Sequence, residues 1–222
     1  MKKLLNLTAW VAILAPGVYL INSWNNLPEK VPMHFDFQGN PDRYGSKTEL
    51  VTLVFFLTVM TIAIYLFFPL IYKIDPKKSA PENKARLKKM GFAITLLLSF
   101  MTFFIIYSSR IGSISLNMNL LVAVLGAFWC ILGNYMFNLN PNYFAGIRLP
   151  WTLHDEENWK ETHRLAGKLW FGGGILILLL AFLLPPKVAL IVFVCITMII
   201  TFIPMVYSYM LYRQKQKNTP QP

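Results

Sequence analysis

Six long apolar runs constrain this chain more than any other feature, because each is long enough to cross a lipid bilayer. They lie at approximately residues 4–21, 50–72, 90–107, 119–137, 169–184 and 188–211. A spanning helix needs about 20 mostly apolar residues, and the hydrocarbon layer excludes exposed loops and strand edges. The sequence therefore predicts an all-α membrane protein, a six-helix transmembrane bundle with a small ordered outer loop and a helical inner loop.

Composition supports this prediction and explains the strong positive charge. Hydrophobic residues make up 55% of the chain and charged residues only 14%, while the formal net charge is +11. Basic residues that flank membrane segments face anionic lipid, so the lipid bilayer is the expected partner and no direct binding of nucleic acid is predicted. Cys130 and Cys195 lie inside apolar runs and are expected as small buried hydrophobes, and the sequence predicts no cofactor.

The distribution of lysine and arginine predicts the orientation in the membrane. With the N-terminus in the cytosol, 16 of the 21 basic residues fall in the N-terminus, 73–89, 138–168 and the tail, and five fall outside. Both termini are therefore expected in the cytosol. The first run follows Lys2 and Lys3, but 21–26 lacks small residues for cleavage, which favours a retained signal anchor.

These features divide the chain into six segments. We expect a first transmembrane helix at 1–22, an extracytoplasmic loop at 23–47 and transmembrane helices two to four at 48–137. A cytoplasmic loop with an interfacial helix follows at 138–168, then transmembrane helices five and six at 169–211 and a disordered tail at 212–222. The glycines at 172–174 predict close helix packing in the fifth span.

The outer loop is too rich in aromatic residues for a simple connector. Val31, Met33, Phe35 and Phe37 alternate with polar residues and proline, which predicts one short strand, and residues 39–42 have turn chemistry. One hypothesis is a metal site, because imidazole and carboxylate side chains are both metal ligands. Its candidate ligands are His34, Asp36 and Asp42. In the alternative, the acidic residue supports the turn and the histidine makes a loop hydrogen bond.

The inner loop begins where Asn140 and Pro141 break the fourth helix. Thr152, with Asp155 three residues on, predicts a helix N-cap, and the following helix is expected from about 153 through 165 toward the fifth span. One face of this helix carries a charged stripe of Glu156, Lys160, Arg164 and Lys168.

A neighbouring face of the same helix carries Trp159 and His163, four residues apart. Tryptophan favours the headgroup region, so these two residues are expected as interface anchors. The alternative for His163 is that it titrates or binds a ligand. Asn134, near the inner end of the fourth helix, is expected to bond a neighbouring helix.

The motifs of both loops resemble those of SdpI-like bacterial membrane proteins. The outer motif runs from Leu27-Pro28 through Val31-Pro32-Met33-His34-Phe35 to 39–47, and the inner motif includes 133–134, 141–142, 146–153, Trp159, 162–164 and Gly167. This chain has Leu149 where the family usually has threonine, and Asn158 where it usually has an aliphatic residue.

The resemblance implies a non-enzymatic immunity protein of the bacterial cytoplasmic membrane that protects against a secreted peptide toxin. It also implies toxin sensing, with a cytosolic winged-helix repressor held at the membrane. The candidate toxin-facing residues are Pro32, His34, Asp36, Gly39, Pro41, Asp42, Tyr44 and Lys47. The candidate partner-facing residues are Asn134, Pro141, Asn142, Gly146, Arg148, Pro150, Trp151, Thr152, Trp159, Thr162, His163 and Arg164.

Two other hypotheses remain open from the residues themselves. A membrane-embedded hydrolase, with or without a metal, could use His163, Arg148 and Glu157 for acid–base chemistry and anion binding, although no nucleophile or zinc-helix motif is present. A small-molecule transporter is the third hypothesis. No ionisable residue lies in the middle of a predicted span, which argues against proton coupling.

Overall fold

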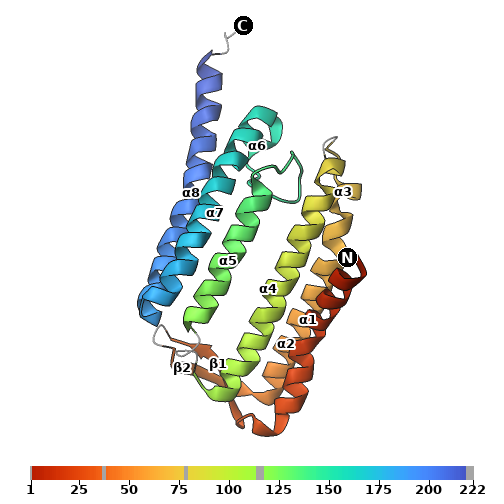
Figure 1. Ribbon diagram of the computed structural model, residues 1–222, viewed down its shortest axis with the longest axis vertical. Helices are drawn as coiled ribbons and strands as arrows, with labels where there is room; N and C mark the ends of the chain where they lie inside the picture. The colour runs from red at the N-terminus through yellow and green to blue at the C-terminus, as the bar shows by residue number, and fades with distance from the viewer. Residues whose placement is uncertain (1, 37–38, 78–79, 114–117, 219–222) are drawn as a thin grey trace.

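The computed structural model describes residues 2–36, 39–77, 80–113 and 118–218 and shows a bundle of long helices with a hairpin at one end (Figure 1). The long helices are α1 (Lys2–Ser23), α2 (Lys47–Phe67), α4 (Lys84–Ile111), α5 (Met118–Met136), α7 (Glu156–Leu183) and α8 (Pro186–Asn218). In the described part of the chain, six helices are long and apolar enough to cross a membrane. The predicted all-α membrane bundle is therefore confirmed.

The connections between these helices contain only short elements. They are η1 (Trp24–Asn26), β1 (Lys30–Phe35), β2 (Pro41–Ser46), η2 (Phe68–Leu70), α3 (Ile71–Ile74), η3 (Ala80–Asn83) and α6 (Pro150–His154). The hairpin β1–β2 lies at one end of the bundle, whereas α3, α6 and the C-terminus lie at the other (Figure 1). We call these the hairpin end and the loop end.

The bundle consists of two groups of three helices. α4 packs against α1 and α2, while α7 packs most extensively against α5 and next against α8. Figure 1 shows α5, α7 and α8 on one side of the molecule and α1, α2 and α4 on the other. α4 and α5 are neighbours but share less contact than the helices within each group.

Local chemistry sets where the helices begin and end. The Ser46 side chain caps α2 by accepting from the Glu49 amide at 3.1 Å. α4 ends at Gly112, which adopts φ +81° and whose amide donates to the Ser108 carbonyl at 2.8 Å. A left-handed residue of this kind favours glycine and closes a helix C-terminus.

The outer surface of the bundle is apolar, as a lipid-facing surface requires. Exposed fractions reach 69% at Phe55, 69% at Phe182 and 75% at Leu183. Several hydroxyls buried within the bundle bond carbonyls of their own helix, such as Thr95 to Gly91 and Thr102 to Leu98, each at 2.8 Å. This pattern inverts that of a soluble protein and agrees with burial in lipid.

Glycines bring α5 and α7 into close contact. A Cβ added to Gly126 would lie 2.8 Å from the Leu178 nitrogen, and one added to Gly174 would lie 2.6 Å from the Cys130 nitrogen. Close packing was predicted for 172–174, and it holds for Gly173 and Gly174. Gly172 has open space around it.

The structure differs from the sequence prediction at three helix boundaries. The helix expected at about 153–165 is the first part of α7, which continues into the fifth span without a break. Asp155, not Thr152, caps it, because the Asp155 carboxylate accepts from the Glu157 and Asn158 amides at 3.0 Å each. The tail was expected to be disordered from residue 212, but α8 remains helical through Asn218.

Two smaller expectations also need correction. Residues 41–46, expected as turn and loop, form a second strand that pairs with β1. Phe37, placed in the predicted strand, lies outside the described residues. Cys195 was expected to be buried among hydrophobic residues, but it is exposed on the outer side of α8, and Cys130 is only partly buried.

Candidate functional site

The residues predicted from the two motifs gather at opposite ends of the bundle. The outer-loop residues form the hairpin, and most of the inner-loop residues form a hydrogen-bonded cluster where residues 137–155 fold against the start of α7.

The hairpin is an antiparallel pair with an ordered turn. β1 and β2 pair from Lys30 opposite Ser46 to Phe35 opposite Pro41, with irregular register on either side of His34. At the turn, the Asp36 carboxylate accepts from the Asn40 amide at 2.9 Å, and Gly39 adopts φ +85°. The turn geometry explains why glycine occurs here, since other residues resist a positive φ.

Hydrogen bonds and apolar packing attach the hairpin to the neighbouring helices. The Ser109 hydroxyl on α4 donates to the Pro32 carbonyl at 2.9 Å, and Lys47 donates to the Trp24 carbonyl at 3.2 Å. Val31 is fully buried among Leu50 and Ile106. The base of the hairpin is thus part of the bundle core, and its outer face is held in a fixed position.

The outer face of the hairpin carries an imidazole–carboxylate pair. His34 Nδ1 lies 2.6 Å from Asp42 Oδ1, with side-chain exposures of 66% and 46%. Tyr44 is 54% exposed on the same strand as Asp42. Among the described residues, no group of three His, Cys, Asp or Glu side chains could hold a metal ion, so the hairpin offers a two-residue pair and not the three-ligand site of the metal hypothesis.

At the loop end, two buried asparagines fix the path of the chain. Asn142 Oδ1 accepts from the amides of Phe144 and Ala145 at 3.0 and 2.7 Å. Asn83 and the backbone of Asn140 exchange two hydrogen bonds, of 2.9 and 3.0 Å. A buried loop must satisfy its backbone polar groups, and these side chains do so while joining the loop to the start of α4.

The segment between α3 and η3 contributes a second link to the same loop. The buried carboxylate of Asp75 accepts from the Tyr143 amide at 2.8 Å. Lys77 donates to the Leu153 carbonyl at 2.7 Å and lies over the Tyr143 ring. The two cytoplasmic segments expected from the sequence are therefore one folded unit.

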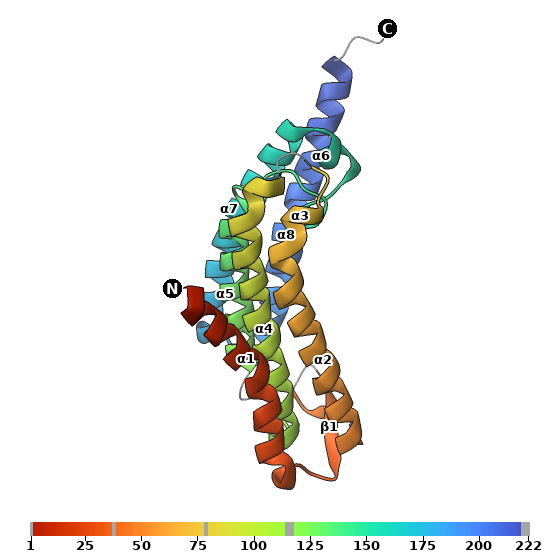
Figure 2. The same cartoon turned by 90° about the vertical axis from the view of Figure 1, so that its right-hand side faces the viewer.

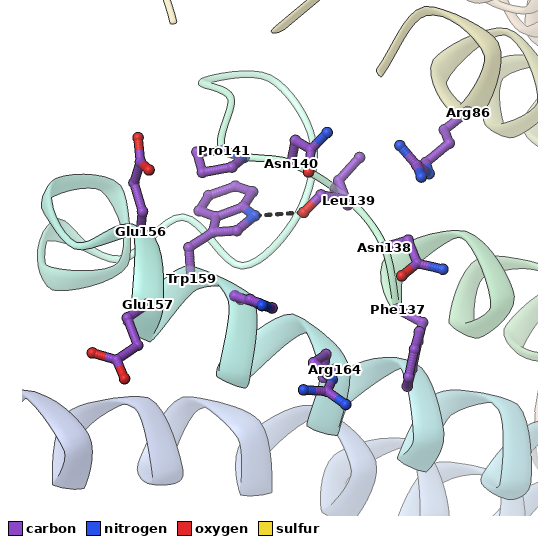
Figure 3. Close-up of a pocket in the computed structure, with 11 residues that line it drawn as sticks. Arg86, Phe137, Asn138, Leu139, Asn140, Pro141, Glu156, Glu157, Trp159 and Arg164 are labelled. Carbon is purple, nitrogen blue, oxygen red and sulfur yellow. Dashed lines mark hydrogen bonds between the residues drawn. The ribbon is translucent and has the colours of Figure 1, made fainter. Parts of the chain in front are cut away.

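Trp159 and His163 lie in the interior of this unit, not at the membrane interface as expected. Each is 1% exposed, and their rings stack with centroids 4.0 Å apart. The Trp159 indole donates to the Leu139 carbonyl at 2.7 Å (Figure 3). Both residues therefore hold the loop against α7.

Both ring nitrogens of His163 have backbone partners. Nδ1 lies 2.8 Å from the Trp159 carbonyl, and Nε2 accepts from the Ile147 amide at 3.0 Å. This pairing fixes a neutral imidazole with its proton on Nδ1. Gly146, at φ +108°, lets the loop approach so closely that an added Cβ would collide with His163 Nε2.

A second buried network joins α6, α7 and α8. The Ser208 hydroxyl accepts from the Trp151 indole at 2.7 Å and donates to Asn158 Oδ1 at 2.9 Å. Asn158 also accepts from the Thr162 hydroxyl at 3.0 Å. The Thr152 hydroxyl instead lies within the loop, where it accepts from the Leu149 amide at 2.9 Å.

A pocket of about 660 Å³ opens beside this unit, and cations from two helices line it. Arg86 comes from α4, and Lys160 and Arg164 come from α7, with Glu156 and Glu157 on the same wall. Figure 3 shows Arg86 and Arg164 on separate helices, with Phe137 and Asn138 between them in this view. The pocket could accept an anionic side chain or phosphate.

Ion pairs connect the loop unit to α8. Lys215 Nζ lies 2.8 Å from Asp155 and 2.6 Å from Glu157. Partial burial raises the pKa of the Asp155 carboxyl, but hydrogen bonds from Lys215 and two α7 amides outweigh it, and the pKa lies below its ordinary 3.8. Asp155 is therefore ionised at neutral pH and caps α7 with a full charge.

The remaining inner-loop candidates differ in their surroundings. Arg148 is exposed and donates to the Tyr143 carbonyl at 2.9 Å. Pro141 lines the pocket, and Pro150 begins α6. Asn134 is exposed, and in the described part of the chain no hydrogen bond joins it to the network.

Sequence reasoning missed four residues that hold this unit together. Asp75, Asn83 and Ser208 are distant from the inner loop in sequence, and Asn158 was noted only as a departure from the family pattern. The sequence did offer one general indication: a polar side chain that becomes buried needs a hydrogen-bond partner. The sequence could not show which residue would supply it.

The groups named for the hydrolase hypothesis have separate partners. His163 is bonded on both nitrogens, Glu157 pairs with Lys215, and Arg148 bonds the Tyr143 carbonyl. These contacts position backbone and helix ends. They show no arrangement of an acid, a base and a nucleophile.

Fold and site together define a multi-pass membrane protein with an ordered hairpin at one end and a folded, polar loop unit at the other. Residues 138–208 match the SdpI/YfhL protein family, and residues 11–62 match a domain of unknown function, DUF1648. The chain is therefore similar to the SdpI/YfhL family in the part that contains the loop unit. The two matches contain the loop unit and the hairpin, respectively.

Two relatives show how far the similarity extends. The immunity protein SdpI of Bacillus subtilis (strain 168) is 28% identical over 216 residues, which is 96% of this chain and 98% of that protein. An uncharacterized protein of Archaeoglobus fulgidus is 44% identical over 52 residues, which is 23% of this chain and 28% of that protein. No solved structure matches the chain.

Proposed function

We propose that this protein is an immunity protein of the bacterial cytoplasmic membrane that protects its cell against a secreted peptide toxin. The observation that carries the proposal is the similarity to the immunity protein SdpI, which extends over 96% of the chain and includes both motif regions. The family's role is therefore transferred as a whole, not from one short motif.

The hairpin is the surface that we assign to the toxin. Its outer face presents His34, Asp42 and Tyr44 on a strand pair whose base is fixed in the bundle core. The excess of basic residues at the loop end favours a cytosolic loop end and an external hairpin end. A secreted peptide would then meet the hairpin first.

The loop unit is the surface that we assign to a cytosolic partner, a winged-helix repressor held at the membrane when toxin is engaged. Its pocket exposes Lys160 and Arg164 beside Arg86, and Arg148 is exposed nearby in the chain. Such cationic groups suit an acidic protein surface. Because α7 runs from this unit through the bundle, it provides a continuous connection between the two ends.

A survival assay tests the protective role. The full chain is expressed in Bacillus subtilis lacking its own SdpI and exposed to the toxin that SdpI neutralises, and in parallel to any peptide toxin encoded beside the chain's own gene. We expect survival to rise at least about tenfold with one of these toxins. Unchanged killing by both, with the protein present in the membrane, contradicts the proposal.

Two variants test the division between the ends. We expect His34→Ala combined with Tyr44→Ala to abolish protection, because both side chains lie on the exposed hairpin face. Lys187→Ala is the matched control, since Lys187 is exposed at the start of α8, beside the turn from α7, and lies outside the motif. Arg148→Ala should preserve protection and weaken recruitment of a repressor, measured by its release into the soluble fraction.

A further inference from the structure

A large apolar groove lies between the two groups of helices, apart from both motif regions. It encloses about 1100 Å³ and is lined by α1, α2, α4 and α5. On α4 its wall follows one face of the helix, from Lys88 and Lys89 through Ala93 and Leu96 to Phe100. The opposite wall is α5, from Tyr135 to Val124.

The two ends of the groove differ in chemistry. Near the loop end, it is bordered by Lys88 and Lys89, and the Tyr135 ring lies beside Lys89. Further along the helices, its lining is aliphatic or aromatic apart from Asn6, which accepts a hydrogen bond from the Tyr65 hydroxyl at 3.1 Å. An amphipathic molecule would therefore lie with its polar group at the loop end and its apolar part along α4 and α5.

The charge at the polar end has one sign. Lys88 and Lys89 are the charged residues that line the groove, and both are exposed. In the described part of the chain, neither is paired with a carboxylate, and Lys89 lies over the Tyr135 ring at 6.0 Å. Two unneutralised ammonium groups at the mouth of an apolar groove favour an anion with a hydrophobic body.

The length of the groove fits one lipid leaflet. Lys88 and Phe100 are twelve residues apart on α4, a rise of roughly 18 Å at about 1.5 Å per residue. Half of the hydrocarbon core measures about 15 Å. Tyrosine favours the headgroup level, which agrees with Tyr135 at the polar end beside Lys89.

From this arrangement we infer that the groove between α4 and α5 is a binding site for an anionic phospholipid of the leaflet at the loop end. The phosphate lies at Lys88 and Lys89, and an acyl chain lies between Ala93 and Leu96 of α4 and Ala127 of α5. The bound lipid fills the space where the two groups of helices make little direct contact.

Quenching of tryptophan fluorescence by brominated lipid tests this site on the full chain in mixed micelles. The probes are phosphatidylglycerol and phosphatidylcholine, each brominated on the acyl chain near the headgroup. The groove signal is the part of the quenching that disappears in Trp10→Phe, because Trp10 lines the groove. We expect this signal to saturate at about tenfold less phosphatidylglycerol than phosphatidylcholine.

A pair of matched variants separates a built site from general attraction to the membrane surface. Lys88→Ala with Lys89→Ala should abolish the preference for phosphatidylglycerol. Lys73→Ala with Lys84→Ala removes the same charge from nearby positions that do not line the groove, and should leave the preference unchanged. Equal quenching by both lipids, no Trp10-dependent quenching, or equal loss of preference in both double variants overturns the inference.

Discussion

At the scale of single residues, side chains that bond backbone groups stabilise the loop end. His163 forms hydrogen bonds with one backbone amide and one backbone carbonyl, and Asn142 accepts from two backbone amides, all within a buried segment. A buried amide or carbonyl without a partner costs about 1–3 kcal/mol. These side chains offset the free-energy cost of burying the loop backbone. This role explains why the motif is rich in polar residues.

Substitution of Gly146 should destabilise the protein. Gly146→Ala would place a Cβ against His163 Nε2 at a backbone φ of +108°, so it should lower the free energy of unfolding by about 2 kcal/mol or more. Thermal unfolding in detergent, followed by circular dichroism, measures the change.

A control separates the collision from the backbone strain. Gly112 also has a positive φ, +81°, but nothing lies within 4 Å of an added Cβ. Gly112→Ala should therefore show the strain alone and a smaller loss than Gly146→Ala. Equal losses in the two variants would mean that contact between Gly146 and His163 does not matter.

At the scale of elements, α7 joins features that the sequence suggested were separate. Its first turns carry the buried face of the loop unit, with Asn158, Trp159 and His163, and its later turns cross the bundle against α5 and α8. A helix of 28 residues spans about 42 Å, more than the ~30 Å hydrocarbon core. The excess length is enough for the motif-bearing first turns to extend beyond a hydrocarbon core of that thickness.

The glycine contact between α5 and α7 provides the element-scale prediction. Gly174→Val should force the helices apart, because an added Cβ already lies 2.6 Å from the Gly126 carbonyl and the Cys130 nitrogen. We expect a loss of about 1–3 kcal/mol in thermal unfolding. Gly172→Val, two residues away and in open space, should be close to wild type. A comparable loss in both variants would attribute the effect to valine in the helix.

At the scale of the whole molecule, the two motif regions lie at opposite ends of six helices. Figure 2 gives the same arrangement from the side, with β1 at one end of the bundle and α6 and the C-terminus at the other. Signals between the ends would therefore have to pass along packed helices.

Cysteine labelling tests the expected orientation. In a background with Cys130→Ala and Cys195→Ala, Tyr44→Cys should react with a membrane-impermeant maleimide in intact cells. Lys217→Cys should react only after the membrane is permeabilised. Both positions are exposed in the structure, so access depends on the side of the membrane. Labelling of Lys217→Cys alone in intact cells would reverse the orientation.

The sequence by itself determined the membrane class, the six spans and the two motif regions. These properties depend on local composition, since about 20 apolar residues in a row have a stable place only in lipid. The sequence did not determine where α7 begins, because both threonine and aspartate are suitable N-cap residues and only the path of the chain around Thr152 and Asp155 selects one. The helical structure of the tail also depends on tertiary contacts, because Lys215 of α8 forms ion pairs with Asp155 and Glu157.

The tertiary structure alone decided which residues meet. Trp159 and His163 have the spacing of an interface pair, but the loop of residues 137–155 folds over them and buries both. Asp75 and Asn83 become part of the same unit because α4 begins beside that loop. Such contacts join residues far apart in the chain. Their partners are set by helix packing, which no local pattern of residues specifies.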